Sequence, residues 1–282
     1  MQRGVAGLLS DRRPVTSADR KATRNALTDR GTIGSTRPFS ALIVNSMPDL
    51  HFVAFGQCFP RYRYAQPANG EAGLFDGDAS RERVDNISDT ALTAFRKHYT
   101  NDTITKDAIF DYVYGVLHAP DYRARFGNDL TKELPRIPKA PDFHAFAAAG
   151  QALARLHLEY ETCTEYPLRE ELKPDNPQPE HFRLGTRAMR YADDAKTTLI
   201  VNDHVRLSGI PAEAHRYAVN GRTPLGWFIA RYRITTDKRS GITNDPNGWF
   251  DDPRDLIAAI RRIVHVSVET VRIVDGLPKA LA

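Results

Sequence analysis

The sequence predicts an α+β fold, with mixed or antiparallel sheet regions, a central helical segment and a C-terminal helical segment. Strand-like runs occupy residues 39–64, helical patterns fill residues 88–160, and a second group of strands and helices follows. Strands and helices therefore come in separate groups, without the regular alternation of a doubly wound parallel sheet. The length of 282 residues and the hydrophobic content of 41% suit a globular protein with one large or two small domains.

Residues 1–87 are predicted to form a basic arm and a strand-rich part. A short apolar run at residues 5–9 predicts a strand, and the polar stretch up to residue 37 predicts a long loop. Further along, apolar or aromatic runs predict three strands, at residues 39–44, 50–55 and 59–64. The polar, glycine-rich stretch 65–87 is expected to be an exposed loop.

Residues 88–160 form the predicted helical part. Ser88 and Thr105 are suitable N-caps for two helices that end at Tyr99 and His118. The apolar residues of the second helix have the spacing of one buried face: Ile109, Tyr112, Val113, Val116 and Leu117.

A short helix is expected at residues 120–127, where Pro120 favours its start and Gly127 its end. Three prolines in residues 135–142 then predict an extended linker. Asp142 is expected to cap the last helix of this part, which ends near residue 160.

Residues 161–282 are predicted to be a mixed strand and helix part that completes the same domain. Its polar, proline-rich beginning, residues 161–187, is the best candidate for a boundary or a surface excursion. Three strand-like runs follow, at residues 188–192, 197–201 and 204–207. Two helices are then expected to begin at Pro224 and Pro253, because proline suits the first helical position.

Positive charge is concentrated at the N-terminus. The formal net charge is only +4, and the whole positive excess lies in the first 37 residues, where basic side chains outnumber acidic ones. This asymmetry is typical of an arm that faces a polyanion, and a solvated, partly disordered terminus is the alternative.

Sequence patterns of several other functions are missing. There is no GxxxxGK[ST] phosphate loop, no histidine pair at metal-ligand spacing and no CxxC pair. The tract at residues 244–247, NDPN, has one proline and no aromatic residue, so it predicts a turn and not an amino-methyltransferase motif. No apolar run could span a bilayer and no signal peptide is evident, so we expect a cytoplasmic protein.

The candidate DNA-binding residues are basic or amide side chains in loops and strands: Arg12, Arg13, Lys21, Arg24, Arg30, Arg61, Arg63, Arg222, Lys238, Arg239 and Asn244. Arginine and lysine neutralise phosphates, and arginine, lysine and asparagine can also contact base edges. For residues 235–247, which include Ser240 and Asn247, the alternative is a well-bonded loop that packs two helices. For Arg61 and Arg63, the alternative is protection of a sheet edge.

Several long tracts carry a family resemblance: FSALIVNSMPDLH (39–51), QCFPRYRY (57–64), IFDYVYGVLHAPDYRARF (109–126), KELPRIPKAPDF (132–143) and YRITTDKRSGITNDPN (232–247). In these tracts the chain resembles the C-terminal target recognition domain of the type ISP restriction–modification enzymes. These are single-polypeptide, type I-like enzymes, often labelled predicted helicases. The resemblance implies a DNA specificity module that directs adenine methylation and ATP-dependent cleavage by other domains.

The resemblance also implies partners and cofactors. The partners would be double-stranded DNA and the methyltransferase and helicase-like domains of a longer parent chain, with no membrane. The motifs of the nuclease, ATPase and methyltransferase are absent from these 282 residues. We therefore expect no catalytic residue, metal or cofactor in this fragment, whereas the parent would use S-adenosylmethionine, ATP and Mg²⁺.

Two other functions stay open at this stage. The chain could be a docking scaffold for the methyltransferase or helicase-like domain, with its long C-terminal helix as the docking surface. It could also be an enzyme with an unrecognised active site, which would need a pocket that gathers buried polar groups.

Overall fold

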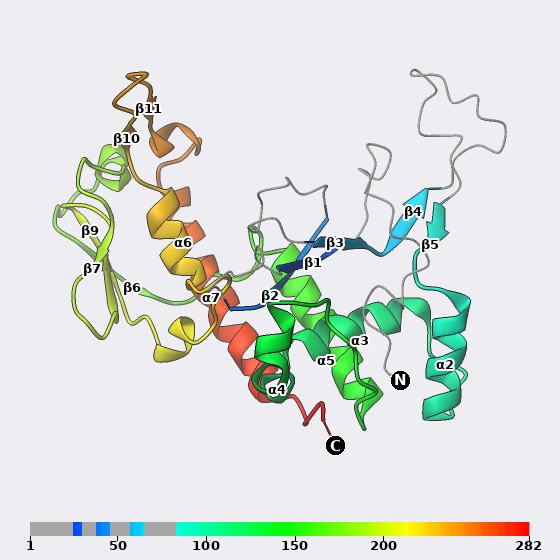
Figure 1. Ribbon diagram of the computed structural model, residues 1–282. Coiled ribbons are helices and arrows are strands. Elements are labelled where there is room, and N and C mark those ends of the chain that lie inside the picture. Colours follow the sequence, from blue (N-terminus) through cyan, green and yellow to red (C-terminus); the bar gives the residue numbers. More distant parts are fainter. Residues whose placement is uncertain (1–24, 30–37, 46–56, 65–82, 282) are drawn as a thin grey trace. The chain divides into compact units, whose positions relative to one another are not determined.

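The computed structural model describes residues 25–29, 38–45, 57–64 and 83–281 of the chain. They belong to two compact units, which are described separately below (Figure 1). The first unit is Met1–Leu158 with Ile273–Ala282, and the second is Glu159–Arg272. Both contain helices and small antiparallel sheets, which confirms the predicted α+β class. The predicted division into three parts stays a prediction.

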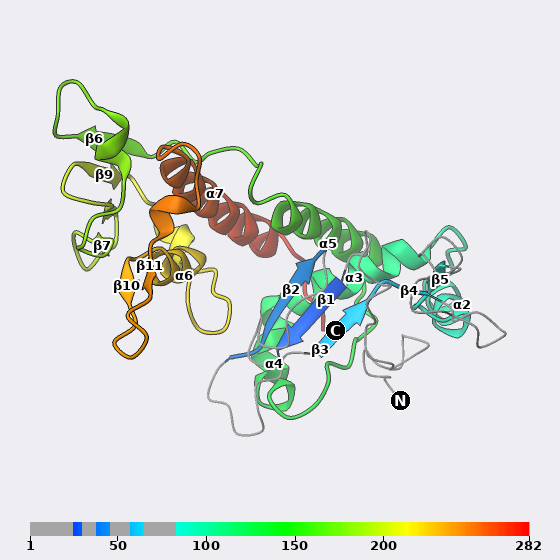
Figure 2. The ribbon, with the colours of Figure 1, turned by 90° about the horizontal axis from the view of Figure 1, so that it is seen from above.

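The first unit contains a three-stranded antiparallel sheet, visible in Figure 2. Its central strand, β1 (Asn25–Asp29), pairs with β2 (Ser40–Val44) on one side and β3 (Gln57–Pro60) on the other. The prediction of a continuous loop up to residue 37 is therefore wrong at β1. The short sequence NALTD has little strand propensity, and it becomes a strand because neighbours on both sides satisfy its backbone groups. The predicted strand at residues 50–55 lies outside the described residues.

The predicted strand at residues 59–64 is interrupted. The chain bends at Arg61, and β4 (Tyr62–Tyr64) then pairs with β5 (Arg83–Asp85), which was expected to be loop. The Arg61 side chain is only 4% exposed and contacts two carboxylates, Asp85 at 2.6 Å and Asp107 at 2.8 Å. Burial alone would raise the pKa of Asp85, but Arg61 and Lys106 lower it below its usual value. The bend therefore serves an ion-pair cluster that the alternating sequence did not reveal.

Four helices follow in the first unit: α2 (Asp89–Tyr99), α3 (Lys106–His118), α4 (Pro120–Leu130) and α5 (Phe143–Leu158). The predicted N-caps Ser88, Thr105 and Asp142 each accept a hydrogen bond from a backbone N–H group in the first turn. The predicted end of α4 at Gly127 is wrong, because Gly127 keeps a helical conformation and the helix continues to Leu130.

Helices α3 and α5 cross with their backbones in close contact. Helix α3 is buried on all sides from Ile109 to His118, and not only on the predicted face. At the crossing, a Cβ atom on Gly150 would overlap the carbonyl group of Asp111 and lie 2.8 Å from the backbone nitrogen of Gly115. A Cβ atom on Gly115 would likewise overlap the carbonyl oxygen of Phe146. Only glycine fits at these two positions.

The extended linker at residues 135–142 is held by tyrosine hydroxyl groups of the helices. Tyr112 donates to the carbonyl oxygen of Pro138 at 2.8 Å and accepts from the backbone N–H of Ala140 at 2.7 Å. Tyr99 donates to the carbonyl oxygen of Ala140 at 2.7 Å. These bonds satisfy backbone groups that have no strand or helix partner.

The second unit is built on a four-stranded antiparallel sheet with the order β6-β9-β8-β7. The strands at β7 (Arg190–Tyr191), β8 (Thr198–Ile200) and β9 (Val205–Ser208) confirm the three predicted runs. The prediction missed β6 (Arg169–Leu172), because the sequence REEL has no apolar alternation and lies at an edge of the sheet.

Two helices complete the second unit. As predicted, α6 (Pro224–Arg231) begins with proline after the N-cap Thr223. Helix α7 (Asp255–Asp275) contributes its residues up to Arg272 to this unit. Its buried stripe packs with the strands in one core, which includes Leu199, Leu207, Ile260 and Val264. No helix among the described residues is long and apolar enough to cross a membrane.

Replacing Gly150 with alanine tests the close crossing of α3 and α5. We expect Gly150→Ala to lower the free energy of unfolding by about 3 kcal/mol, because the added methyl group meets backbone atoms that cannot rotate away. The matched control is Gly127→Ala in α4, where a Cβ atom meets nothing within 4 Å. That variant should be neutral or more stable by up to about 1 kcal/mol. Urea denaturation followed by circular dichroism measures both, and equal effects would contradict the proposed contact.

One buried and one half-buried histidine, His118 and His157, are expected to make the first unit sensitive to acid. The Nδ1 atom of His118 donates to the carbonyl oxygen of Tyr114 at 2.8 Å, and the Tyr114 hydroxyl lies 2.7 Å from Nδ1 of His157. Burial, followed by the nearby charge of Arg123, lowers the pKa of His157 to about 4 and that of His118 well below its usual value. Both imidazoles are therefore neutral in the folded protein at neutral pH.

Stability should fall as the pH falls below about 6.5, because the unfolded chain then binds protons that the folded chain does not. For His157 this loss continues down to a pH of about 4. His157→Gln removes one titrating group and should flatten the pH dependence in this window, measured by urea denaturation at several pH values. An unchanged pH dependence would show that folding does not change the pKa of His157.

Candidate nucleic-acid interface

The structure places six of the eleven predicted DNA-binding residues. The other five lie outside the described residues: Arg12, Arg13, Lys21, Arg24 and Arg30. Two of the six belong to the first unit, Arg61 and Arg63. The remaining four belong to the second unit: Arg222, Lys238, Arg239 and Asn244.

In the first unit, Arg61 is buried in its ion pairs with Asp85 and Asp107, and its guanidinium also lies 4.3 Å from the ring centre of Tyr62. A contact between Arg61 and DNA would require breaking both ion pairs. In the structure, Arg61 holds β4, β5 and the start of α3 together. Arg63 is half-buried in β4, opposite Val84 of β5. Contact of either residue with DNA stays a prediction.

In the second unit, the tract predicted to be a loop folds as a hairpin, which we call the tip hairpin (residues 235–244; Figure 1). Its strands are β10 (Thr235–Thr236) and β11 (Thr243–Asn244). One carboxylate oxygen of Asp237 accepts three hydrogen bonds at the turn, from the backbone N–H groups of Arg239 and Ser240 and from the Ser240 hydroxyl. These bonds, those to Ser240 first, lower the pKa of Asp237.

The tip hairpin exposes two cations and one large apolar side chain. Lys238 and Arg239 are exposed, and neither forms an ion pair with another described residue. Ile242 is 70% exposed, more than any other large hydrophobic residue that the structure describes as exposed. Asn244 is half-buried in β11, opposite Thr235. At this turn the Asp237 carboxylate bonds to backbone N–H groups, while the side chains of Lys238, Arg239 and Ile242 are exposed to solvent.

Asn247, at the end of the same tract, has a structural task. Its amide group bonds to both the N–H and the carbonyl oxygen of Leu184, at 2.7 and 3.0 Å. The NDPN tract forms the predicted turn, in which Asp245 accepts a hydrogen bond from the backbone N–H of Asn247. Asn247 is therefore a residue of a well-bonded packing loop, as the alternative interpretation of residues 235–247 expected.

Two arginine–tryptophan pairs lie on or beside α6, and we call them together the arginine–tryptophan row: Arg222 with Trp227, and Arg231 with Trp249. The guanidinium of Arg222 lies 4.7 Å from the ring centre of Trp227, and that of Arg231 lies 4.7 Å from the ring centre of Trp249. Both tryptophans are about 40% exposed, at 40% and 41%. Trp227 and Arg231 lie on one face of α6 because they are four residues apart.

Local structure fixes the first members of the row. Asn220 and Gly221 both have positive φ angles, 52° and 77°, and form a tight turn that ends at Arg222. The indole N–H of Trp227 donates to the carbonyl oxygen of Val219 at 2.8 Å. Sequence reasoning selected Arg222 alone, although the four-residue spacing of Trp227 and Arg231 in a predicted helix already placed them together.

The row can contact a polyanion or an aromatic ligand. Stacking over a ring engages the face of a guanidinium, while its N–H groups at the edge can still donate to phosphate or to a base. Exposed tryptophan rings can stack on bases, and they are also frequent in protein–protein contacts.

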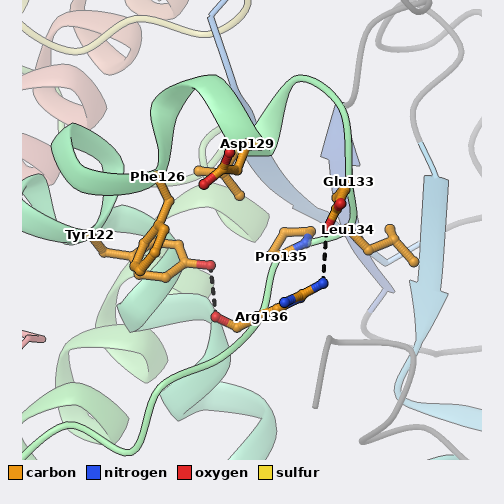
Figure 3. A pocket seen from close by; sticks show the side chains of 8 residues that line it. Tyr122, Phe126, Asp129, Glu133, Leu134, Pro135 and Arg136 are labelled. Carbon is orange, nitrogen blue, oxygen red and sulfur yellow. Dashed lines mark hydrogen bonds and ion pairs between the residues drawn. The ribbon is translucent and has the colours of Figure 1, made fainter. Parts of the chain in front are cut away.

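A hollow of about 510 Å³ among the described residues of the first unit is one candidate for the enzyme alternative (Figure 3). Its lining includes the exposed ion pair of Arg136 and Glu133 at 3.0 Å, and Tyr122, which donates to the carbonyl oxygen of Arg136. Burial raises the pKa of Tyr122 to about 12. The two acids of the lining, Asp129 and Glu133, are both exposed, so the hollow lacks the buried acid that this alternative requires. The described residues also form no cluster of three metal-ligating side chains.

Comparison with known proteins gives one family and several solved relatives. The chain matches the Type ISP C-terminal specificity domain over residues 8–259. It is similar to the ATP-dependent Type ISP restriction-modification enzyme LlaBIII bound to DNA, with a TM-score of 0.77 and 29% identity. It is also similar to a nuclease-deletion mutant of the Type ISP enzyme LlaGI in complex with a DNA substrate mimic (TM-score 0.72, 29% identity). A third similar structure is the DrdV–DNA complex, with a TM-score of 0.75 and 33% identity.

Each of these alignments covers 92% of this chain but only a small part of the relative: 16% of LlaBIII, 21% of the LlaGI mutant and 25% of DrdV. None of the curated proteins matches the chain. The family match spans most of the sequence and includes the tip hairpin and the arginine–tryptophan row. The resemblance seen in the sequence is thus confirmed, and the chain belongs to the Type ISP C-terminal specificity domain family.

Proposed function

We propose that this chain is the DNA target recognition module of a type ISP restriction–modification enzyme. It selects the sequence at which other domains of the parent methylate adenine and cleave DNA with ATP. The family match over residues 8–259 carries this proposal, and the solved relatives, two titled as DNA complexes and one as a complex with a DNA substrate mimic, support it.

The second unit has side chains suited to this task. The tip hairpin and the arginine–tryptophan row expose cations that can neutralise phosphates, next to aromatic or apolar groups that can contact bases. Outside this unit, the first 37 residues of the sequence carry a positive excess of their own. Phosphate contacts position such a module on the duplex, and base contacts select the sequence.

The chemical steps belong to the parent enzyme in this proposal. S-adenosylmethionine, ATP and Mg²⁺ would bind its methyltransferase and helicase-like domains, which are partners of this module, and the whole would work in the cytoplasm.

One observation favours docking as a second candidate function. Tryptophan and arginine dominate the energetics of many protein interfaces, and the arginine–tryptophan row exposes both. In that case the row would contact a neighbouring domain of the parent, and DNA recognition would use other surfaces.

Sequence selection by the isolated chain tests the main proposal. We expect the chain to enrich one short sequence from a pool of duplexes with randomised central positions, because base contacts discriminate between sequences. Sequencing of the bound fraction after several rounds measures this. A bound fraction as random as the starting pool would contradict target recognition.

The arginine–tryptophan row gives a prediction for affinity. Arg222→Ala combined with Arg231→Ala should weaken binding to all duplexes and reduce the slope of log affinity against log salt by about 2, because two phosphate contacts are lost. The control, Arg222→Lys combined with Arg231→Lys, keeps both charges and should keep the slope. Fluorescence anisotropy across a salt series measures both, and an unchanged slope in the alanine variant would favour docking.

Catalytic inactivity of the fragment is also testable. With duplex DNA, S-adenosylmethionine, ATP and Mg²⁺ present, we expect neither methyl transfer nor ATP hydrolysis above the background without protein. Radiolabelled methyl transfer and phosphate release measure the two reactions. Turnover that scales with protein concentration would contradict the proposed division of tasks.

A further inference from the structure

We propose that the tip hairpin inserts into the major groove of DNA, with Ile242 against the methyl group of a thymine and Lys238 and Arg239 on the flanking backbone. This inference rests on the proposed function and assigns part of its base recognition to one structural element.

The shape and rigidity of the hairpin suit a groove. The major groove of B-DNA admits a two-stranded β-ribbon, and the tip hairpin is such a ribbon. The hydroxyl groups of Thr236 and Thr243 lie 2.9 Å apart across the strands. The backbone N–H of Asp237 donates to the backbone carbonyl oxygen of Ile242 at 2.9 Å. Gly241 closes the turn with a φ angle of 71°. A turn that is already ordered loses little conformational entropy when it binds.

The exposed Ile242 is the part that base recognition would use. At 70% exposure it belongs to neither hydrophobic core, so packing does not explain a large apolar side chain at this turn. Within a polar DNA groove, the thymine C5-methyl group is the apolar contact that a side chain at the base edges meets. Ile242 would therefore favour thymine over cytosine at one position.

The charges beside Ile242 favour DNA over a protein partner. Lys238 and Arg239 flank the same turn, while one oxygen of the nearby Asp237 carboxylate accepts three hydrogen bonds from the turn's own N–H and hydroxyl groups. An apolar side chain set among unpaired cations matches a polyanion with apolar base edges. An apolar protein surface would leave both cations without a partner.

Deoxyuridine substitution tests the methyl contact directly. The intact 282-residue chain first selects its preferred duplex, and each thymine is then replaced in turn by deoxyuridine, which lacks only the C5-methyl group. We expect one replacement to weaken binding about fourfold, the effect of one buried methyl group. The Ile242→Ala variant should bind the thymine duplex less tightly and should not distinguish thymine from deoxyuridine at that position.

A charge variant tests the placement of the hairpin. Lys238→Ala combined with Arg239→Ala should reduce the salt slope by about 2. The matched control removes two exposed cations of the same unit, Lys173→Ala combined with Arg190→Ala, and should reduce it less. Thermal melting should be unchanged in all variants, because these side chains are exposed.

The outcomes separate this inference from the proposed function. If the wild-type chain selects no sequence, the proposed function itself fails. If it selects a sequence but no thymine is sensitive to deoxyuridine, or Ile242→Ala keeps that sensitivity, the hairpin inference is overturned. The hairpin inference is also overturned if the control, Lys173→Ala with Arg190→Ala, reduces the salt slope as much as Lys238→Ala with Arg239→Ala does. Removing any two exposed cations of this unit would then have the same effect on the salt slope.

Discussion

The fold of the first unit depends on the backbone contact between α3 and α5. Because Gly115 and Gly150 have no side chains, the two helices approach until backbone atoms touch, and α3 becomes buried on every side. Polar side chains between Ile109 and His118 are therefore buried and need partners within the protein. The tyrosines of this helix therefore bond to the neighbouring backbone, as Tyr112 does with the linker, and its buried His118 stays neutral. The proline-rich linker is ordered as a consequence of this helix pair.

In the second unit, polar side chains fix the conformation of the short loops. The Asp237 carboxylate closes the tip hairpin, the Asn247 amide pairs with the backbone of Leu184, and positive φ angles at Asn220 and Gly221 turn the chain ahead of the arginine–tryptophan row. Each of these groups satisfies backbone atoms that would otherwise need water. Loops ordered in this way can present side chains at fixed positions, which base recognition requires.

Local signals in the sequence were sufficient for much of the fold. Ser88, Thr105 and Thr223 cap helices because a hydroxyl group before a helical pattern has one favourable use. Strand β1 and the tip hairpin could not be found in this way, because their short polar sequences become strands only through pairing. Arg61 shows the same limit for the site, since its two carboxylate partners are distant in sequence.

Composition also hides the charge of the surface. A net charge of +4 in 282 residues does not indicate a DNA-binding protein. In the second unit, however, Asp237, Asp245 and Asp252 each accept hydrogen bonds from backbone N–H groups of their own turns. The partial positive charges of those N–H groups partly offset the carboxylates, whereas Lys238 and Arg239 of the tip hairpin are exposed and form no ion pair with another described residue. The tip hairpin therefore carries two cations without an ion pair among the described residues beside one carboxylate that is bonded within the turn, although the sequence around it contains nearly as many acidic as basic residues.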